Sequence, residues 1–212
     1  MNTWVAKLLS YLFHPLLMPT YLLGVLFFVA PNTTGAVLMP VESRAILLLV
    51  ICIYTFLIPA LGVYGMVRLR IVEGIMLKEL NDRRYPFWLT VLVYLVATYF
   101  FGWKLVQVGE VAPIMRIVLG SITVSIILVG IISFFWQISA HATGVGGVTG
   151  FLAAALLRLE DPLLLSPFLL FVVISGWVAG SRLQLNAHTM NEILAGFLIG
   201  VLVCGGAGFL FL

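Results

Sequence analysis

Long apolar segments separated by short polar connectors make up almost the whole chain. Seven such segments can be traced, over residues 8–30, 44–67, 87–103, 114–138, 142–157, 163–180 and 190–212. A helix needs roughly 20 mostly apolar residues to cross a bilayer. The segments are continuously apolar and lack the alternation of barrel strands. The pattern therefore predicts an all-α, polytopic transmembrane helix bundle with six to seven spans.

Composition agrees with this pattern and limits the domain organisation. Hydrophobic residues make up 63% of the 212 residues and charged residues 9%, whereas a soluble domain carries about 25% charged residues. The connectors are short, so we expect residues 1–212 to form a single integral membrane domain. The first segment contains Pro15 and Pro19 and no obvious signal-peptide cleavage site, so we expect it to be retained as a span.

The two cysteines and His14 lie inside apolar segments, and we expect each of them to have a structural role. Cys52 and Cys204 lack the paired spacing of a disulfide or metal site, which predicts two buried free thiols. No residue pattern indicates a cofactor. His14 precedes Pro15 within the first span. We interpret it as a structural residue whose ring is satisfied by a neighbouring helix.

The polar run at 181–192, between the last two apolar segments, is the strongest candidate for a functional site. It contains Arg182, His188 and Glu192. Ionisable groups at a membrane edge are costly unless they pair or function. If the last helix opens here, His188 and Glu192 stand at i and i+4 on one face. Glu192 can then hold one ring nitrogen of His188 while the other nitrogen faces a substrate.

Two further polar stretches, at 78–86 and 139–141, are expected on the same side of the membrane as residues 181–192. Two apolar segments separate the first stretch from the second, and two more separate the second from the third. The same parity places the N-terminus on this side and the C-terminus on the opposite side. Segments 142–157 and 190–212 are rich in glycine, and each begins after a histidine. Because small residues allow close helix packing in membranes, we expect these two helices to bring the two histidine turns together.

Together the three stretches contain the groups that phosphate-ester cleavage requires, namely a nucleophile, an acid for the leaving alcohol and positive charge around the phosphoryl oxygens. We expect His188 to attack phosphorus, with Glu192 orienting its ring, and His141 to protonate the leaving oxygen.

The remaining groups would bind the phosphoryl oxygens. Arginine does so through a bidentate fork and lysine as a point charge, which suits Arg182, Arg84 and Lys78. The Ser139 hydroxyl and the backbone N–H groups at a helix start would add donors. The alternative for Ser139 is a plain helix cap.

The order Ser-Arg, five residues, His, three residues, acid resembles the third signature of the type 2 phosphatidic acid phosphatases, lipid phosphate phosphatases related to vanadium haloperoxidases. The resemblance implies a phosphohistidine on His188 and phosphate binding by Arg182. Glu192 stands where that family usually has aspartate.

The other two stretches carry weaker resemblances to the same family. Ser139-Ala140-His141 is similar to its second signature, Pro-Ser-Gly-His, which implies that Ser139 and Ala140 contact phosphate and that His141 is the general acid. Residues 78–86 are similar to its first signature, a lysine followed by Arg-Pro. Tyr85 here separates Arg84 from the proline, so the role of that arginine falls to Arg84, to Arg83 or to both.

The resulting hypothesis is a metal-independent, cofactor-free integral membrane phosphatase acting on lipid phosphate monoesters or diphosphates. Its expected partners are the lipid substrate and the bilayer, not nucleic acid. The same residues also suit a non-enzymatic transporter or anionic-lipid-binding protein, or a lipid phosphotransferase. The identity of the lipid and the oligomeric state stay open.

The distribution of basic residues gives two answers about the side on which the site lies. Seven of them are expected on the site side and four on the other, which favours a cytoplasmic site. Without the three expected phosphate ligands Lys78, Arg84 and Arg182, the counts are four and four. Bacterial members of the resembling family usually face outward. We therefore expect a multi-pass cell-membrane protein with an extracytoplasmic site.

Overall fold

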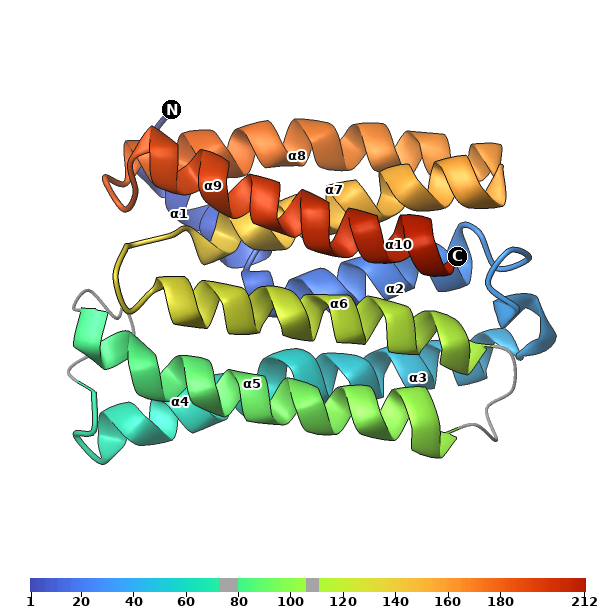
Figure 1. Ribbon diagram of the computed structural model, residues 1–212, viewed down its shortest axis with the longest axis horizontal. Helices are drawn as coiled ribbons and strands as arrows, with labels where there is room; N and C mark the ends of the chain where they lie inside the picture. The colour runs from blue at the N-terminus through green and yellow to red at the C-terminus, as the bar shows by residue number, and fades with distance from the viewer. Residues whose placement is uncertain (73–79, 106–110) are drawn as a thin grey trace.

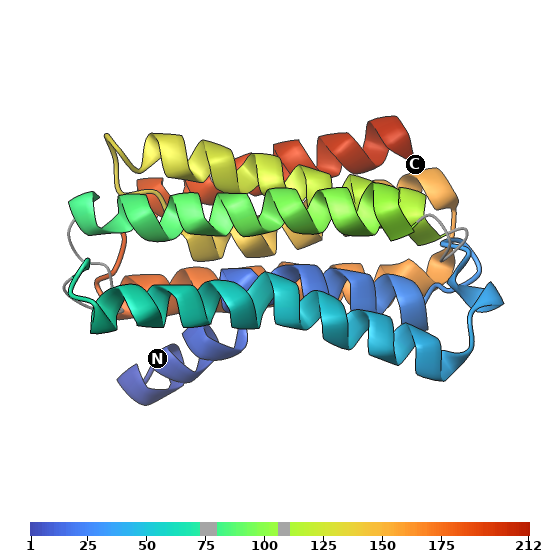
Figure 2. The same cartoon turned by 90° about the horizontal axis from the view of Figure 1, so that it is seen from below.

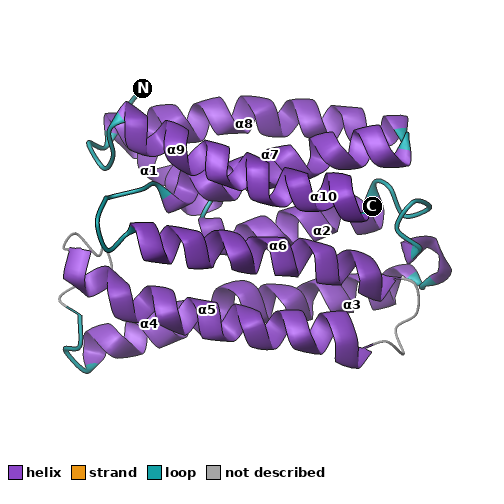
Figure 3. Cartoon of the chain, in the orientation of Figure 1, coloured by secondary structure: helices purple, strands orange, loops and turns teal. Residues whose placement is uncertain are grey.

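The computed structural model describes residues 1–72, 80–105 and 111–212. In these ranges all regular structure is helical (Figure 3). Seven helical segments within them are long and apolar enough to cross a membrane. They cover Thr3–Phe28, Val41–Arg68, Tyr85–Trp103, Val111–Ile132, Ala140–Leu159, Pro162–Gln184 and Met190–Phe211. The predicted all-α transmembrane bundle is confirmed.

Three of the spans are interrupted helices. The first consists of α1 (Thr3–Leu12) and α2 (Met18–Phe28), separated by a 3-10 turn at Pro15–Leu17. A π-helical turn, Ile53–Leu57, joins α3 (Val41–Cys52) to α4 (Ile58–Arg68). Another, Val201–Gly205, joins α9 (Met190–Gly200) to α10 (Gly206–Phe211). The continuous helices are α5 (Leu80–Trp103), α6 (Val111–Ile132), α7 (Ala140–Leu159) and α8 (Leu165–Gln184).

Several predicted boundaries are wrong by a few residues. The segment predicted at 114–138 ends at Ile132, and residues 133–139 form a loop. This loop contains Phe135 and Trp136, both exposed. Aromatic residues of this kind favour the membrane–water interface, so their apolar character falsely lengthened the segment. The fifth segment, predicted at 142–157, is longer than expected because α7 begins at Ala140, directly after its N-cap Ser139.

The central helix is α7, the most deeply buried of the seven spans. It packs against α8 and α9 and also contacts α2 and α6. The helices run side by side along the long axis of the molecule (Figure 1), except that α1 is inclined to the others (Figure 2). The glycine-rich fifth helix is therefore the centre of the bundle.

Glycines allow α7 and α9 to pack at backbone distance. A Cβ atom on Gly196 would lie 2.6 Å from the carbonyl oxygen of Ser139, and one on Gly146 would overlap the Phe197 backbone. One on Gly150 would lie 2.7 Å from Cα of Val201 in the following π turn. The predicted packing of these two helices is confirmed, and it brings the starts of α7 and α9 together.

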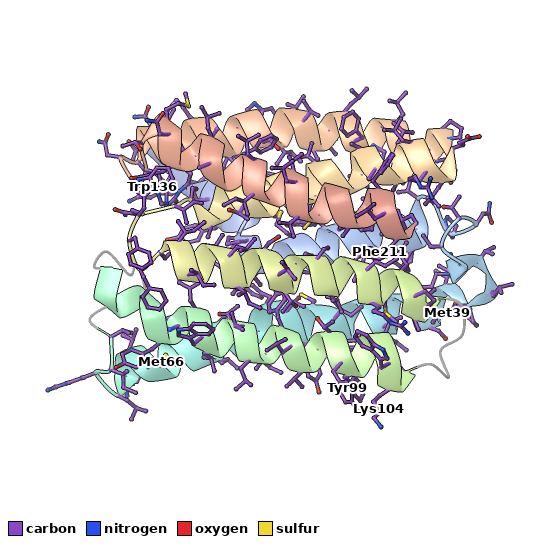
Figure 4. The ribbon with its side chains drawn as sticks, in the orientation of Figure 1. Met39, Met66, Tyr99, Lys104, Trp136 and Phe211 are labelled. Atoms are coloured by element: carbon purple, nitrogen blue, oxygen red, sulfur yellow. The ribbon has the colours of Figure 1, made fainter. Side chains whose placement is uncertain are left out.

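The polar turns before α7 and α9 lie at the same end of the bundle as the end of α4 and the start of α5 (Figure 1). The N-terminus is at this end and the C-terminus at the other, as parity predicts. Trp136 and Met66 mark this end in Figure 4, and Met39 and Lys104 mark the opposite one. We call the end with Trp136 the site end.

At the opposite end, two arginines donate hydrogen bonds to backbone carbonyl oxygens at the ends of helices. Arg44 is buried and donates hydrogen bonds to the carbonyl oxygens of Met39, Phe27 and Val37 at 3.0–3.4 Å. Arg116 donates to the carbonyl oxygen of Gly102 at 2.9 and 3.1 Å. Carbonyls in a last helical turn lack intrahelical donors, so these two cations have a structural role besides any effect on topology.

We predict that Gly150→Ala destabilises the protein, because its methyl group would collide with the Val201 backbone, which cannot move aside as a side chain can. Overpacking of this kind costs about 1–3 kcal/mol. The measurement is the melting temperature in detergent. The matched control is Gly176→Ala on α8, where a Cβ would meet no atom within 4 Å; it should melt at or slightly above the wild-type temperature. Equal melting temperatures for Gly150→Ala and wild type would contradict the close packing.

Candidate functional site

The start of α9 fixes Glu192 beside His188. Thr189 is the N-cap of α9 and forms a capping box, in which its Oγ1 accepts from the Glu192 N–H and Glu192 Oε2 accepts from the Thr189 N–H at 3.0 Å. The same Oε2 lies 3.2 Å from Nδ1 of His188. The predicted i,i+4 contact is thus present, and the capping box holds the carboxylate in place.

A second acceptor meets the same ring nitrogen. The Gln137 carbonyl oxygen, in the loop before α7, lies 3.0 Å from Nδ1 of His188. A carbonyl and a carboxylate can only accept, so the proton is on Nδ1 and the lone pair of a neutral ring is on Nε2. The His188 side chain is only 6% exposed, and it lines a cavity inside the bundle. The nitrogen that holds the lone pair is therefore not the one that meets Gln137 and Glu192.

Ser139, directly before α7, differs in position from its neighbours Ala140 and His141. Ser139 is fully buried and its Oγ accepts from the Ala142 N–H at 3.3 Å, so it is the N-cap. Its own N–H donates to the Glu192 carbonyl oxygen at 3.3 Å. Ala140 and His141 line the cavity, but Ser139 is not among the lining residues. The hydroxyl therefore stabilises the start of α7, the alternative recognised in the sequence.

His141 is held by the first helix. Its Nε2 lies 3.1 Å from the carbonyl oxygen of Ser10 in α1. Because a carbonyl only accepts, Nε2 is the nitrogen that carries the proton. The involvement of α1 was not predicted, since a backbone carbonyl leaves no trace in residue type.

Arg182 lies in the last turn of α8 and also reaches α1. Its Nη1 donates to Oγ of Ser10 at 3.3 Å. Ser10 and Ser181 are both buried, and their hydroxyl oxygens are 3.4 Å apart. Arg182 lines the same cavity as His141 and His188. The structure thus brings four of the predicted residues to one cavity, since Ala140 lines it as well, with Glu192 behind His188.

The cavity has a volume of about 540 Å³, within the range usual for small-molecule sites. Its polar lining includes Arg182 and the three histidines of the chain. The remaining walls are mostly apolar and extend to Cys204 in the last π turn. A cavity of this composition suits a ligand with an anionic head and an apolar body.

The predicted first stretch is only partly described. Lys78 lies outside the described residues. Arg83 and Arg84 belong to the first turns of α5, but the structure does not describe their side chains. Pro86, two residues on from Arg84, lines the cavity, as does Tyr64 of α4. The start of α5 therefore borders the cavity, and the contribution of Lys78, Arg83 and Arg84 stays a prediction.

His14 is a site residue that was not recognised from the sequence. Its Nδ1 accepts from the Leu16 N–H at 3.3 Å, so its partner lies in its own turn and not in a neighbouring helix as predicted. Its ring lines the cavity, with the ring centre 5.5 Å from that of His141. The signal in the sequence was the His-Pro pair. A proline disfavours helical geometry in the residue before it, so the preceding helix ends there and the side chain of that residue can leave the helix surface.

Cys52 and Cys204 are free, the second buried and the first partly buried. Over the described residues, no group of three or more His, Cys, Asp or Glu side chains gathers closely enough to hold a metal ion.

Comparison of the chain with protein-family models, with curated proteins and with solved structures gives no match. The fold and the site define a helical membrane protein with a histidine- and arginine-lined cavity. The resemblance to the type 2 phosphatidic acid phosphatases rests on residues 78–86, 139–141 and 181–192 alone.

Proposed function

We propose that this protein is an integral membrane phosphatase that hydrolyses lipid phosphate monoesters or diphosphates through a phosphohistidine on His188, without a metal ion. The observation that carries the proposal is the Glu192–His188 contact, with the ring of His188 on a cavity that Arg182 also lines. Such an arrangement of acid, imidazole and cation matches the requirements of phosphoryl transfer.

In the first step, Nε2 of His188 attacks phosphorus. An N–P bond forms and the bond from phosphorus to the lipid oxygen breaks. The ring becomes positively charged, and Glu192 stabilises this charge through the Nδ1 proton. Gln137 supports the same ring orientation through its carbonyl oxygen.

The phosphoryl oxygens need positive charge and donors. Arg182 supplies the cation on the cavity wall, and its planar fork suits two phosphoryl oxygens. Ala140 begins α7 beside the cavity, where first-turn N–H groups favour an anion. Lys78 and either Arg83 or Arg84 complete phosphate binding in this proposal. Ser139 contributes by capping α7.

His141 is proposed to protonate the leaving lipid oxygen and then to deprotonate the water that hydrolyses the phosphohistidine. The acid is the imidazolium form of the ring, which becomes neutral when it gives a proton to the lipid oxygen and can then accept the proton of the water. The Nε2–H is donated to the Ser10 carbonyl oxygen here, so this nitrogen must exchange that partner for the substrate. Hydrogen bonds of catalytic groups often rearrange when substrate binds. Cleavage of the N–P bond then releases phosphate and restores neutral His188.

A lipid substrate follows from the apolar part of the cavity. The cavity extends from the histidines to Cys204 and is walled mainly by apolar side chains. A lipid can place its phosphate at the polar end and its hydrocarbon portion along this wall. A small soluble phosphate ester would leave the apolar wall unused.

We predict that the detergent-solubilised protein releases phosphate from lipid phosphates in the presence of EDTA, and that His188→Ala lowers the rate by about three orders of magnitude or more, the scale for losing a nucleophile. The measurement is free phosphate over time. Asn191→Ala is the matched control, since Asn191 is exposed in the same first turn of α9, and it should retain wild-type activity.

The result also separates the alternatives. A transporter or lipid-binding protein releases no phosphate, and a phosphotransferase releases it only slowly until an acceptor alcohol is added. Unchanged phosphate release in His188→Ala, or release that EDTA abolishes, contradicts the proposal.

We further propose that the site end faces the extracytoplasmic side of the cell membrane. The support is the family resemblance together with the use of cations at that end for phosphate binding. The C-terminus lies at the opposite end of the bundle (Figure 1), so this orientation requires a cytoplasmic C-terminus.

A reporter fused after Leu212 tests the orientation. We predict that green fluorescent protein at this position is fluorescent and that alkaline phosphatase is inactive, because the first folds in the cytoplasm and the second needs an oxidising compartment. The reverse pair of results would place the site end in the cytoplasm.

A further inference from the structure

The helix break between α1 and α2 places a third imidazole beside the proposed phosphate site. His14 is the N-cap of the Pro15–Leu17 turn, and its ring lines the cavity. Pro15 fixes this break because it has no N–H and disfavours helical geometry in the residue before it. The imidazole is thereby turned from the helix surface into the interior of the bundle.

The cap determines which nitrogen of His14 carries a proton. Nδ1 accepts from the Leu16 N–H, so Nδ1 holds the lone pair and Nε2 holds the hydrogen of the neutral ring. In the part of the chain that the structure describes, Nε2 of His14 has no hydrogen-bond partner. The atom is also not fully buried, because the buried polar atoms that lack a partner do not include it. Since the ring of His14 lines the cavity, this unpaired N–H is placed to face that space.

The other two histidines differ from His14 in this respect. The proton of His188 is shared by Gln137 and Glu192, and that of His141 is donated to the Ser10 carbonyl oxygen. His14 and His141 are in edge contact, at 77° between their ring planes. The three rings therefore provide one oriented nucleophile, one ring held by α1 and one N–H donor directed at the cavity.

We propose that His14 binds the phosphoryl group of the substrate by donating its Nε2–H to a phosphoryl oxygen. This role rests on the proposed function and adds to it a substrate-binding residue on the first span. A neutral imidazole can polarise an oxygen in this way, and a bond to a charged acceptor is stronger than a neutral one. The helix cap and the phosphate contact use different nitrogens, so a single ring performs both.

The two roles can be separated by substitution. Asparagine is a strong N-cap residue, so His14→Asn retains an acceptor for Leu16 but has no group at the position of Nε2. His14→Gln has a longer side chain whose amide can extend toward the cavity, but it is a poorer cap. The probes are decyl phosphonate binding by calorimetry, phosphate release from a lipid phosphate, and the melting temperature, all on the full chain in detergent.

The expected result is a crossed pattern. His14→Asn retains the wild-type melting temperature but loses about tenfold to a hundredfold in affinity for decyl phosphonate, the range for a hydrogen bond to a charged group. His14→Gln melts at a lower temperature and retains more of the affinity than His14→Asn. Phosphate release falls in the same order.

Wild-type binding of decyl phosphonate by His14→Asn overturns the inference, because His14 is then only a cap. So does a wild-type protein that does not bind the phosphonate. If the wild type binds it and releases no phosphate, while His14→Asn binds it weakly, the inference stands and the proposed phosphatase activity fails. If the wild type releases phosphate and His14→Asn matches it in both assays, the phosphatase stands and the role of His14 fails.

Discussion

The glycine-mediated contact between α7 and α9 is the constraint on which the candidate site depends. Without side chains at Gly146 and Gly196, the two backbones approach closely enough for the turn before α7 to meet the turn before α9. The Ser139 N–H then reaches the Glu192 carbonyl oxygen, and the Gln137 carbonyl oxygen reaches His188. In a bilayer, where apolar side chains gain little by leaving lipid, close packing of this kind is a main source of helix association. The site is thus a consequence of packing in the membrane interior.

The first span completes the site from the other side. Ser10 of α1 accepts hydrogen bonds from His141 through its carbonyl and from Arg182 through its hydroxyl, so three helices meet at one residue. The break at Pro15 then allows His14 to join the cavity. Burying these ionisable groups at a membrane edge is costly, and the described hydrogen bonds offset part of that cost. The apolar remainder of the cavity extends to Cys204, where the proposed lipid substrate would place its hydrocarbon portion.

Much of this arrangement could be predicted from the sequence, and the rest could not for identifiable reasons. Apolar segment length predicted six to seven spans, of which the structure has seven among the described residues, and helical spacing predicted the His188–Glu192 contact. The loop around Trp136 was assigned to a span because interfacial aromatics are as apolar as buried ones. The Gln137 and Ser10 carbonyls were missed because every residue has one, and His14 because its ring direction depends on a helix break. The roles of Lys78, Arg83 and Arg84 stay predictions.

The central claim, that His188 becomes phosphorylated, is tested most directly by trapping the intermediate. The protein is mixed with a lipid phosphate carrying labelled phosphorus, quenched in alkali, in which phosphohistidine is stable, and digested for tandem mass spectrometry. The account predicts labelled phosphate on the peptide that contains His188, located on that residue, and its loss after brief acid treatment. Steady release of phosphate with the label on another residue, or with no label on the protein at any quench time, would contradict it.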